Sequence, residues 1–210
     1  QLVPSSFLTE GIDQTRGWFY TLHVLGTLLF KQAAFSNCIV MGHVNDEQGR
    51  KMSKRLGNVV DPMAVVEETG ADALRWYFYV NDPEQSSRFS AKLVREAAQG
   101  FLLPLWNALS FFTIYANLDG WRPGKTKDVL LKERADLDRW ILLRLDELIE
   151  KVTQDLESYT VAPAARAIEA FLDDLTNWYI RRSRDRYWAS ADAASVDKEA
   201  GYQTLYEVLT

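Results

Sequence analysis

A polar segment at residues 45–58 carries four cations within six positions. Two of them, Lys51 and Lys54, stand three residues apart, so their ammonium groups can share one polyphosphate. Flexible lysine side chains suit a pyrophosphate leaving group because they follow negative charge as it develops on the bridging oxygen. Gly49 and Gly57 supply the backbone freedom that a closing loop needs. The pattern predicts a mobile phosphate clamp; the alternative is a solvated basic surface.

A second segment, residues 10–19, offers groups that suit a nucleoside and an acyl phosphate. Gly11 lets the backbone approach a ribose, and the Asp13 carboxylate accepts hydrogen bonds from paired hydroxyls. The amide of Gln14 both donates and accepts. A strand turns into a helix here, which is where an open α/β sheet presents ligand-binding groups. The alternative is that Asp13 only caps the helix and Trp18 only packs in a core.

A third segment, residues 177–188, combines four arginines with four aromatic residues at the end of a predicted helix. Arginine binds phosphates and aromatic rings stack on bases, so this segment can contact RNA. The arginines can instead pair with helix-end carbonyls or nearby aspartates, while the aromatic rings fill a helical bundle. Both interpretations stay open for each of Arg181, Arg182, Arg184 and Arg186.

The elements that position the first two segments are short. Apolar runs predict a strand at residues 7–10, a helix at residues 16–31 and a buried strand at residues 36–44. This order is the unit of an open parallel sheet, whose ligands bind beyond the carboxyl ends of the strands. Gly11 and Gly42 would then face one crevice.

Helices dominate the rest of the chain. Asp61 and Pro62 predict a helix start, Gly70 its end, and residues 71–80 a second short helix. Beyond residue 90, apolar residues recur every three or four positions, which predicts an antiparallel bundle of longer helices. The three apolar stripes run over residues 97–115, 137–156 and 161–179, with an interruption expected at Pro104 and a linker at residues 121–125.

Composition narrows the class of protein. Acidic residues outnumber basic ones, 29 to 24, so attraction to nucleic acid is expected only from local basic patches. The single cysteine, Cys38, excludes an internal disulfide and a cysteine-based zinc site, and favours a reducing, cytoplasmic compartment. We expect no apolar stretch long enough to span a bilayer, and no membrane partner.

The lysine segment resembles a known signature. Residues 51–55 read Lys-Met-Ser-Lys-Arg and are similar to the KMSKS motif of class I aminoacyl-tRNA synthetases, with Arg55 in place of the last serine. The resemblance implies that Lys51 and Lys54 are catalytic and that Met52 and Ser53 also contact ATP. It implies an α/β half of a Rossmann-like nucleotide-binding domain over residues 1–90, followed by an all-α helical bundle, the anticodon-binding domain, over residues 91–210.

The segment at residues 10–19 is similar to a fingerprint of isoleucyl-tRNA synthetases, EGxDQxRGWF. By this resemblance Gly11 and Asp13 hold the adenylate ribose, and Trp18 forms a wall of the side-chain pocket. Glu10 and Gln14 would contact the adenylate and its aminoacyl group.

The next strand end, Gly42-His43-Val44, resembles the family segment that lies against adenine. Met41 stands where the family often has histidine, so the role of His43 stays open between adenine contact and a lone polar residue at a strand end.

The resemblance also implies partners. These are ATP with Mg²⁺, isoleucine, tRNA(Ile) and the N-terminal half of the catalytic domain. That half carries the HIGH motif, which is absent here because the only histidines are His23 and His43. The isolated chain is therefore expected to be inactive. Two alternatives remain: a stand-alone tRNA-binding module without catalysis, and an unrelated helical scaffold.

Overall fold

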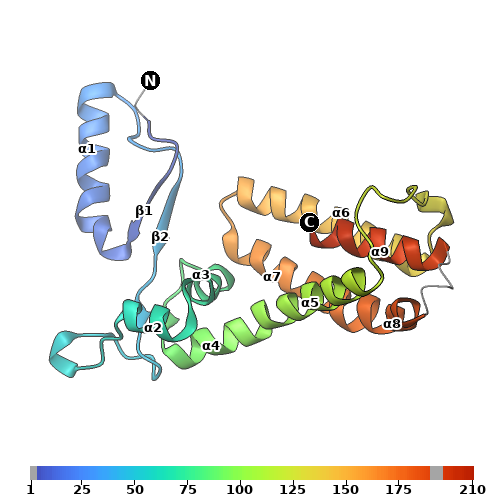
Figure 1. The fold of residues 1–210 in the computed structure, drawn as a ribbon. Helices are drawn as coiled ribbons and strands as arrows, with labels where there is room; N and C mark the ends of the chain where they lie inside the picture. The colour runs from blue at the N-terminus through green and yellow to red at the C-terminus, as the bar shows by residue number, and fades with distance from the viewer. Residues whose placement is uncertain (1–3, 190–195) are drawn as a thin grey trace. The chain divides into compact units, whose positions relative to one another are not determined.

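A computed structural model describes residues 4–189 and 196–210 (Figure 1). The chain divides into two compact units, Gln1–Arg95 and Glu96–Thr210. The first holds the short strands, and the second is built from helices.

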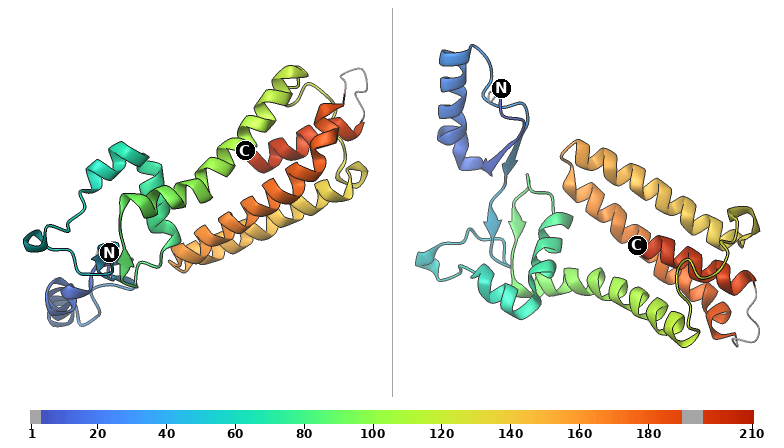
Figure 2. Two further views of the ribbon diagram at one scale, coloured as in Figure 1. Left: turned by 90° about the horizontal axis from the view of Figure 1, so that it is seen from below. Right: turned by 45° about the horizontal axis from the view of Figure 1, so that its top comes forward.

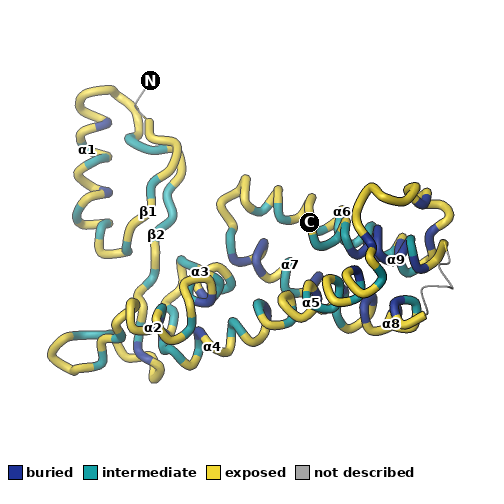
Figure 3. Tube along the Cα trace, viewed as in Figure 1, coloured by how far each residue is buried: buried dark blue, intermediate teal, exposed yellow. Residues whose placement is uncertain are grey.

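The first unit contains the expected strand–helix–strand arrangement (Figure 1). Strand β1, Leu8–Gly11, pairs in parallel with β2, Cys38–Met41, so that Gly11 stands opposite Met41. A 3-10 helix, Ile12–Arg16, and helix α1, Trp18–Phe30, connect them. Most of α1 is exposed (Figure 3), and its buried residues are Phe19 and Gly26. The parallel pairing places both strand ends at one edge, as the sequence pattern predicts.

The strand expected at residues 36–44 is split, and this expectation was wrong. Its second part is β3, Val44–Asn45, which pairs in parallel with β4, Ser87–Arg88, in a separate sheet. The break falls at Gly42, whose N–H donates to the Pro83 carbonyl at 2.8 Å. A Cβ at Gly42 would lie 2.5 Å from the Gln85 carbonyl carbon, so only glycine lets these two backbones meet.

Two short helices follow as expected. The Asp61 carboxylate accepts from the Met63 N–H at 3.0 Å and caps α2, Pro62–Thr69. Gly70, with φ of 87°, ends that helix, and α3, Ala71–Val80, begins directly after it. Tyr77 of α3 is buried against the ring of Phe89, with ring centroids 6.0 Å apart.

Helices α4, Ala91–Gly100, and α5, Leu102–Leu118, are separated at Phe101. The interruption expected from Pro104 is present, three residues before the proline, which has no N–H to donate to the Gly100 carbonyl. Within residues 4–189 and 196–210, this 28-residue stretch, Ala91–Leu118, is long and apolar enough to cross a membrane by length and composition alone. The expectation that no stretch has that length was wrong.

The second unit is a helical bundle, which confirms the predicted class (Figure 2). Helix α6, Asp136–Glu157, packs against α7, Val161–Asp173. Between them the chain turns at Tyr159, with φ of 59°. A π-helix, Asp174–Ile180, and α8, Arg181–Trp188, continue α7. One helix of the bundle was missed. It is α9, Val196–Leu209, which packs on α5, α6 and α8 and buries Tyr202 and Leu205.

Candidate functional site

The acidic turn, which comprises residues 11–14, lies at the carboxyl end of β1. The Gln14 amide oxygen accepts from the Trp18 N–H at 2.8 Å, and its nitrogen donates to Asp13 Oδ2 at 3.1 Å. Gln14 therefore caps α1, and Asp13 does not, so the Asp13 carboxylate stays exposed at the edge of the sheet. A Cβ at Gly11 would lie 2.6 Å from Asp13 Oδ1, so the glycine leaves room for the carboxylate.

The neighbouring strand end brings Gly42 and His43 to the same edge, because Gly11 and Met41 are paired across the sheet. The side chains of His43 and Val44 are exposed, while the His43 carbonyl accepts from the Ser87 N–H at 3.0 Å. The side chain of His43 is thus available to a ligand at this edge.

Trp18 and Glu10 flank the acidic turn. Trp18 begins α1 and is 51% exposed, so it does not pack in a core in this chain. Glu10 stands opposite Val40 in the sheet and is also exposed. Both side chains are therefore exposed next to the acidic turn in the sequence.

The lysine loop, residues 46–58, follows β3 directly. Lys51 and Lys54 are exposed, and neither makes an ion pair in the described part of the chain. The Ser53 side chain accepts from the Leu56 N–H at 3.3 Å and caps a 3-10 helix, Lys54–Leu56. Gly49 and Gly57 have φ of 82° and 63°, a conformation that favours glycine. The loop therefore presents two uncompensated ammonium groups to solvent.

A buried acid beneath this loop was not singled out from the sequence. Asp46 is 4% exposed, and hydrogen bonds from Asn58 and Arg50 lower its pKa to about 2. Because folding lowers this pKa, the ionised carboxylate stabilises the fold fully above its unfolded pKa of about 3.9. That stabilisation is lost as pH falls through about 2. Asp46 lies in a run of polar residues, which gives no local sign of burial.

The arginine segment divides into a surface part and a core part. Arg181, Arg182 and Arg184 are exposed, and the Arg182 guanidinium lies 5.4 Å from the centre of the Trp178 ring. The Arg186 side chain is only 14% exposed. Its guanidinium donates to Asp138 Oδ1 at 2.7 Å and to Oδ2 at 2.8 Å, and it also pairs with Asp197 at 3.0 Å.

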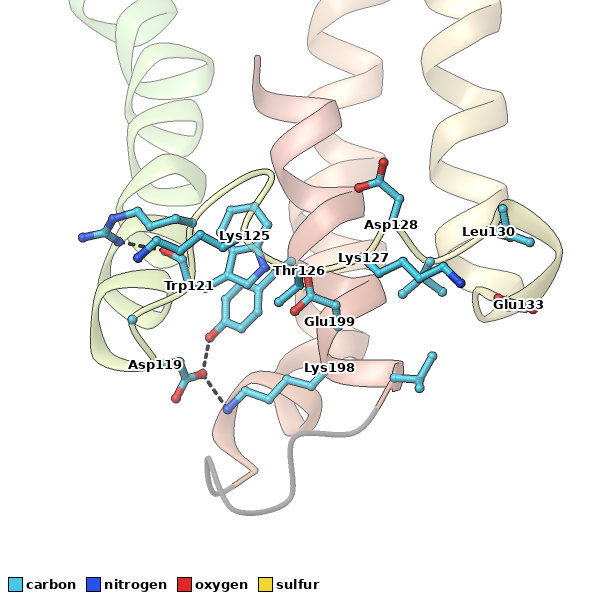
Figure 4. Close-up of a pocket in the computed structure, with 15 residues that line it drawn as sticks. Asp119, Trp121, Lys125, Thr126, Lys127, Asp128, Leu130, Glu133, Lys198 and Glu199 are labelled. Carbon is cyan, nitrogen blue, oxygen red and sulfur yellow. Dashed lines mark hydrogen bonds and ion pairs between the residues drawn. The ribbon is translucent and has the colours of Figure 1, made fainter.

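A separate pocket of about 830 Å³ lies between the linker after α5 and helix α9 (Figure 4). Trp121 is buried, donates to Glu199 at 2.8 Å and stacks on Tyr202 with ring centroids 5.5 Å apart. Trp121 thus anchors the start of the predicted linker to α9, a contact that the sequence analysis did not predict. None of the predicted site residues lines this pocket, and its charged lining includes two residues of each sign beside the linker: Lys125, Lys127, Asp128 and Glu133.

Metal-ligating side chains are dispersed. Over residues 4–189 and 196–210, no three histidine, cysteine or acidic side chains gather in a way that could hold a metal ion.

Comparison with known proteins identifies the family. Residues 1–90 match the family model of class I tRNA synthetases (I, L, M and V), and residues 138–210 match the anticodon-binding domain of tRNA ligases. The isoleucine–tRNA ligases of Thermus thermophilus and Deinococcus radiodurans are 51% and 48% identical over 98% of this chain. The chain spans only about a fifth of their length, 20% and 19%.

A solved structure shares the fold. The methionyl-tRNA synthetase of Mycobacterium tuberculosis, in complex with methionyl-adenylate, superposes with a TM-score of 0.74 at 24% identity. The match covers 99% of this chain and 39% of that one. From both family models and these relatives, we conclude that the chain belongs to the class I aminoacyl-tRNA synthetases, in the group of the isoleucine–tRNA ligases.

Proposed function

We propose that the protein carrying this chain joins isoleucine to ATP, giving isoleucyl adenylate and pyrophosphate, and then transfers the aminoacyl group to tRNA(Ile). One observation carries the proposal: the parallel pairing of Gly11 with Met41 gathers the acidic turn and His43 at one edge of the sheet. That edge is where open α/β sheets bind nucleotides. The lysine loop follows the same strand end along the chain, after β3.

The reaction needs no covalent nucleophile on the protein. The carboxylate of isoleucine attacks the α-phosphorus, and the bond to the bridging oxygen of pyrophosphate breaks. Lys51 and Lys54 stabilise the charge that develops on the departing phosphates, with Met52 and Ser53 contacting ATP beside them. Bound magnesium would neutralise phosphate charge and would come with ATP, since the described acids do not gather to hold it.

The remaining site residues orient the substrates. Asp13 accepts hydrogen bonds from the ribose hydroxyls, which the backbone approaches at Gly11. Gln14 holds the Asp13 carboxylate and, with Glu10, contacts the aminoacyl group. Trp18 forms a wall of the isoleucine pocket, and Gly42-His43-Val44 lies against adenine. This arrangement catalyses by positioning and electrostatics.

The 210-residue chain alone is expected to show no isoleucine-dependent exchange of pyrophosphate into ATP. Its sequence holds one half of the nucleotide site and lacks the HIGH motif of the other half. Radiolabelled pyrophosphate exchange with and without isoleucine checks this. Exchange that depends on isoleucine and disappears in Lys54→Ala would show that this half-site is sufficient by itself, contrary to the expectation.

The helical unit contributes tRNA contacts through its exposed arginines. Arg181→Ala and Arg184→Ala are each expected to weaken tRNA binding several-fold and to lower the slope of log K against log salt by about 1, because each loses a phosphate contact. Fluorescence anisotropy with labelled tRNA(Ile) at several salt concentrations measures both quantities. We leave Arg186 out of this surface because Asp138 occupies its guanidinium.

A matched control is Arg139→Ala, which removes an exposed arginine that pairs with Asp136 on α6. Its affinity and salt slope should equal those of the unchanged chain. An equal loss in Arg139→Ala and Arg181→Ala would mean that tRNA responds only to overall charge. Retention of salt-dependent binding without exchange activity in the full-length protein would favour the stand-alone tRNA-binding module.

A further inference from the structure

The buried carboxylate of Asp46 holds the first half of the lysine loop. Oδ1 accepts from the N–H groups of Gln48 and Arg50, at 3.1 and 2.8 Å, and Oδ2 accepts from Arg50 Nε at 2.8 Å. The backbone closes the same turn, because the Asp46 N–H donates to the Arg50 carbonyl at 2.9 Å. Residues 46–50 therefore form a fixed turn that ends where Lys51 begins.

The side chain of Asn58 holds the second half. Its amide nitrogen donates to Asp46 Oδ2 at 2.9 Å and to the Lys51 carbonyl at 3.3 Å. Its amide oxygen accepts from the Ser53 N–H at 2.9 Å. One side chain thus joins the buried acid to the backbone on both sides of Met52, across seven residues of sequence.

We propose that Asp46 and Asn58 are positioning residues that hold the lysine loop in the shape in which Lys51 and Lys54 can receive a polyphosphate. The inference rests on the proposed function, and it names the part of the chain that sets the lysine geometry. Neither residue touches the phosphates. Each acts through the backbone from which the two lysine side chains emerge.

The physical reason is the cost of ordering a loop. Fixing several residues when the substrate binds opposes binding, whereas hydrogen bonds formed beforehand have already ordered them. Catalysis by charge stabilisation is also sensitive to position, because a displacement of about 1 Å can lower the rate about 100-fold. A loop joined at its base by Asn58 keeps the lysine backbone in place.

Trypsin tests the anchor in the 210-residue chain, because it cleaves after lysine and arginine and the loop contains Arg50, Lys51, Lys54 and Arg55. Asn58→Ala removes three hydrogen bonds, so cleavage within the loop should become at least about 10-fold faster. Cleavage at Lys125 and Lys127 in the helical unit serves as an internal reference and should not change. Gln48→Ala is the matched loop control, since within the described residues that side chain only accepts a hydrogen bond from Arg50 Nη2.

Inorganic pyrophosphate distinguishes the phosphate role of the loop from its anchoring by Asn58. It should protect the loop of the unchanged chain from trypsin and protect Asn58→Ala at least about 10-fold less well, since the variant must order the loop on binding. No protection of the unchanged chain would contradict the phosphate role in the proposed function, while faster cleavage of Asn58→Ala would still support the anchor. Equal cleavage and equal protection in the two chains would overturn the anchor.

In the full-length synthetase, Asn58→Ala should lower kcat of pyrophosphate exchange about 10- to 100-fold with KM for isoleucine unchanged. A merely structural lesion would change both. Asn58→Asp places two carboxylates together, and adding Asp46→Asn restores a donor–acceptor pair between the positions. The double variant should be more active than Asn58→Asp alone. If the losses of activity in the single variants simply added up in the double variant, the proposed coupling of Asp46 and Asn58 would be contradicted.

Discussion

Lys54→Ala in the full-length synthetase is expected to slow isoleucine-dependent pyrophosphate exchange by about two to three orders of magnitude. The Lys54 ammonium is exposed and makes no ion pair in the described part of the chain, so its charge is free to stabilise the departing phosphates. The loss should appear in kcat more than in KM for isoleucine, because the interaction strengthens as the bond to pyrophosphate breaks. Steady-state exchange at varied ATP and isoleucine measures both constants.

A suitable control is Lys132→Ala, which removes an exposed lysine from a 3-10 helix of the helical unit, Leu131–Glu133. It should leave exchange unchanged. Lys54→Arg keeps the charge but changes its shape, and should recover only part of the rate. If Lys54→Ala and Lys132→Ala gave the same activity, the loop would be a solvated basic surface and the assignment of Lys54 would fail.

Local signals in the sequence predicted the features that are fixed locally. Asp61 and Gly70 bound α2 because a cap and a positive φ are properties of a few adjacent residues. The parallel pair of strands followed from the order strand, helix, strand. The signature around Lys51 marked a loop, and its flanking glycines do adopt positive φ.

Features set by distant residues were not predicted. The break at Gly42 depends on the backbone at Gln85, which no local pattern connects to it. Helix α9 has Tyr202, Leu205 and Leu209 at helical spacing, but it follows the last of the three predicted apolar stripes, which ends at residue 179. The Gln14 side chain, rather than Asp13, caps α1 because a 3-10 turn intervenes before the helix.

The largely buried position of Arg186 is the clearest example of a feature set by a distant residue. The run of four arginines gave each residue the same prospect of binding RNA. Its buried partner, Asp138, lies 48 residues earlier on α6. Tyr179 donates to Asp138 Oδ1 at 2.7 Å, and burial raises the pKa of Tyr179, so its hydroxyl stays protonated and able to donate. The carboxylate thus joins α6, the π-helix and α8 inside the bundle.

Asp138→Ala is expected to lower the free energy of unfolding of the helical unit by about 3–5 kcal/mol. Asp138 is fully buried, and its removal leaves the Arg186 guanidinium in the core without its bidentate partner. Urea denaturation of the 210-residue chain, followed by circular dichroism, measures the change. A loss of this size is a large part of the stability of a domain, so partial unfolding without urea would also agree with the prediction.

Two further variants distinguish the buried pair from other causes. Asp136→Ala breaks an ion pair with Arg139 in which the aspartate side chain is 95% exposed, and should cost less than about 0.5 kcal/mol. Asp138→Leu combined with Arg186→Met replaces both charges with apolar groups and should recover part of the lost stability, because the Tyr179 hydroxyl still lacks its acceptor. The same double variant should bind tRNA as tightly as the unchanged chain, because Arg186 acts inside the bundle. If a stable double variant lost tRNA affinity, Arg186 would contribute to tRNA binding after all.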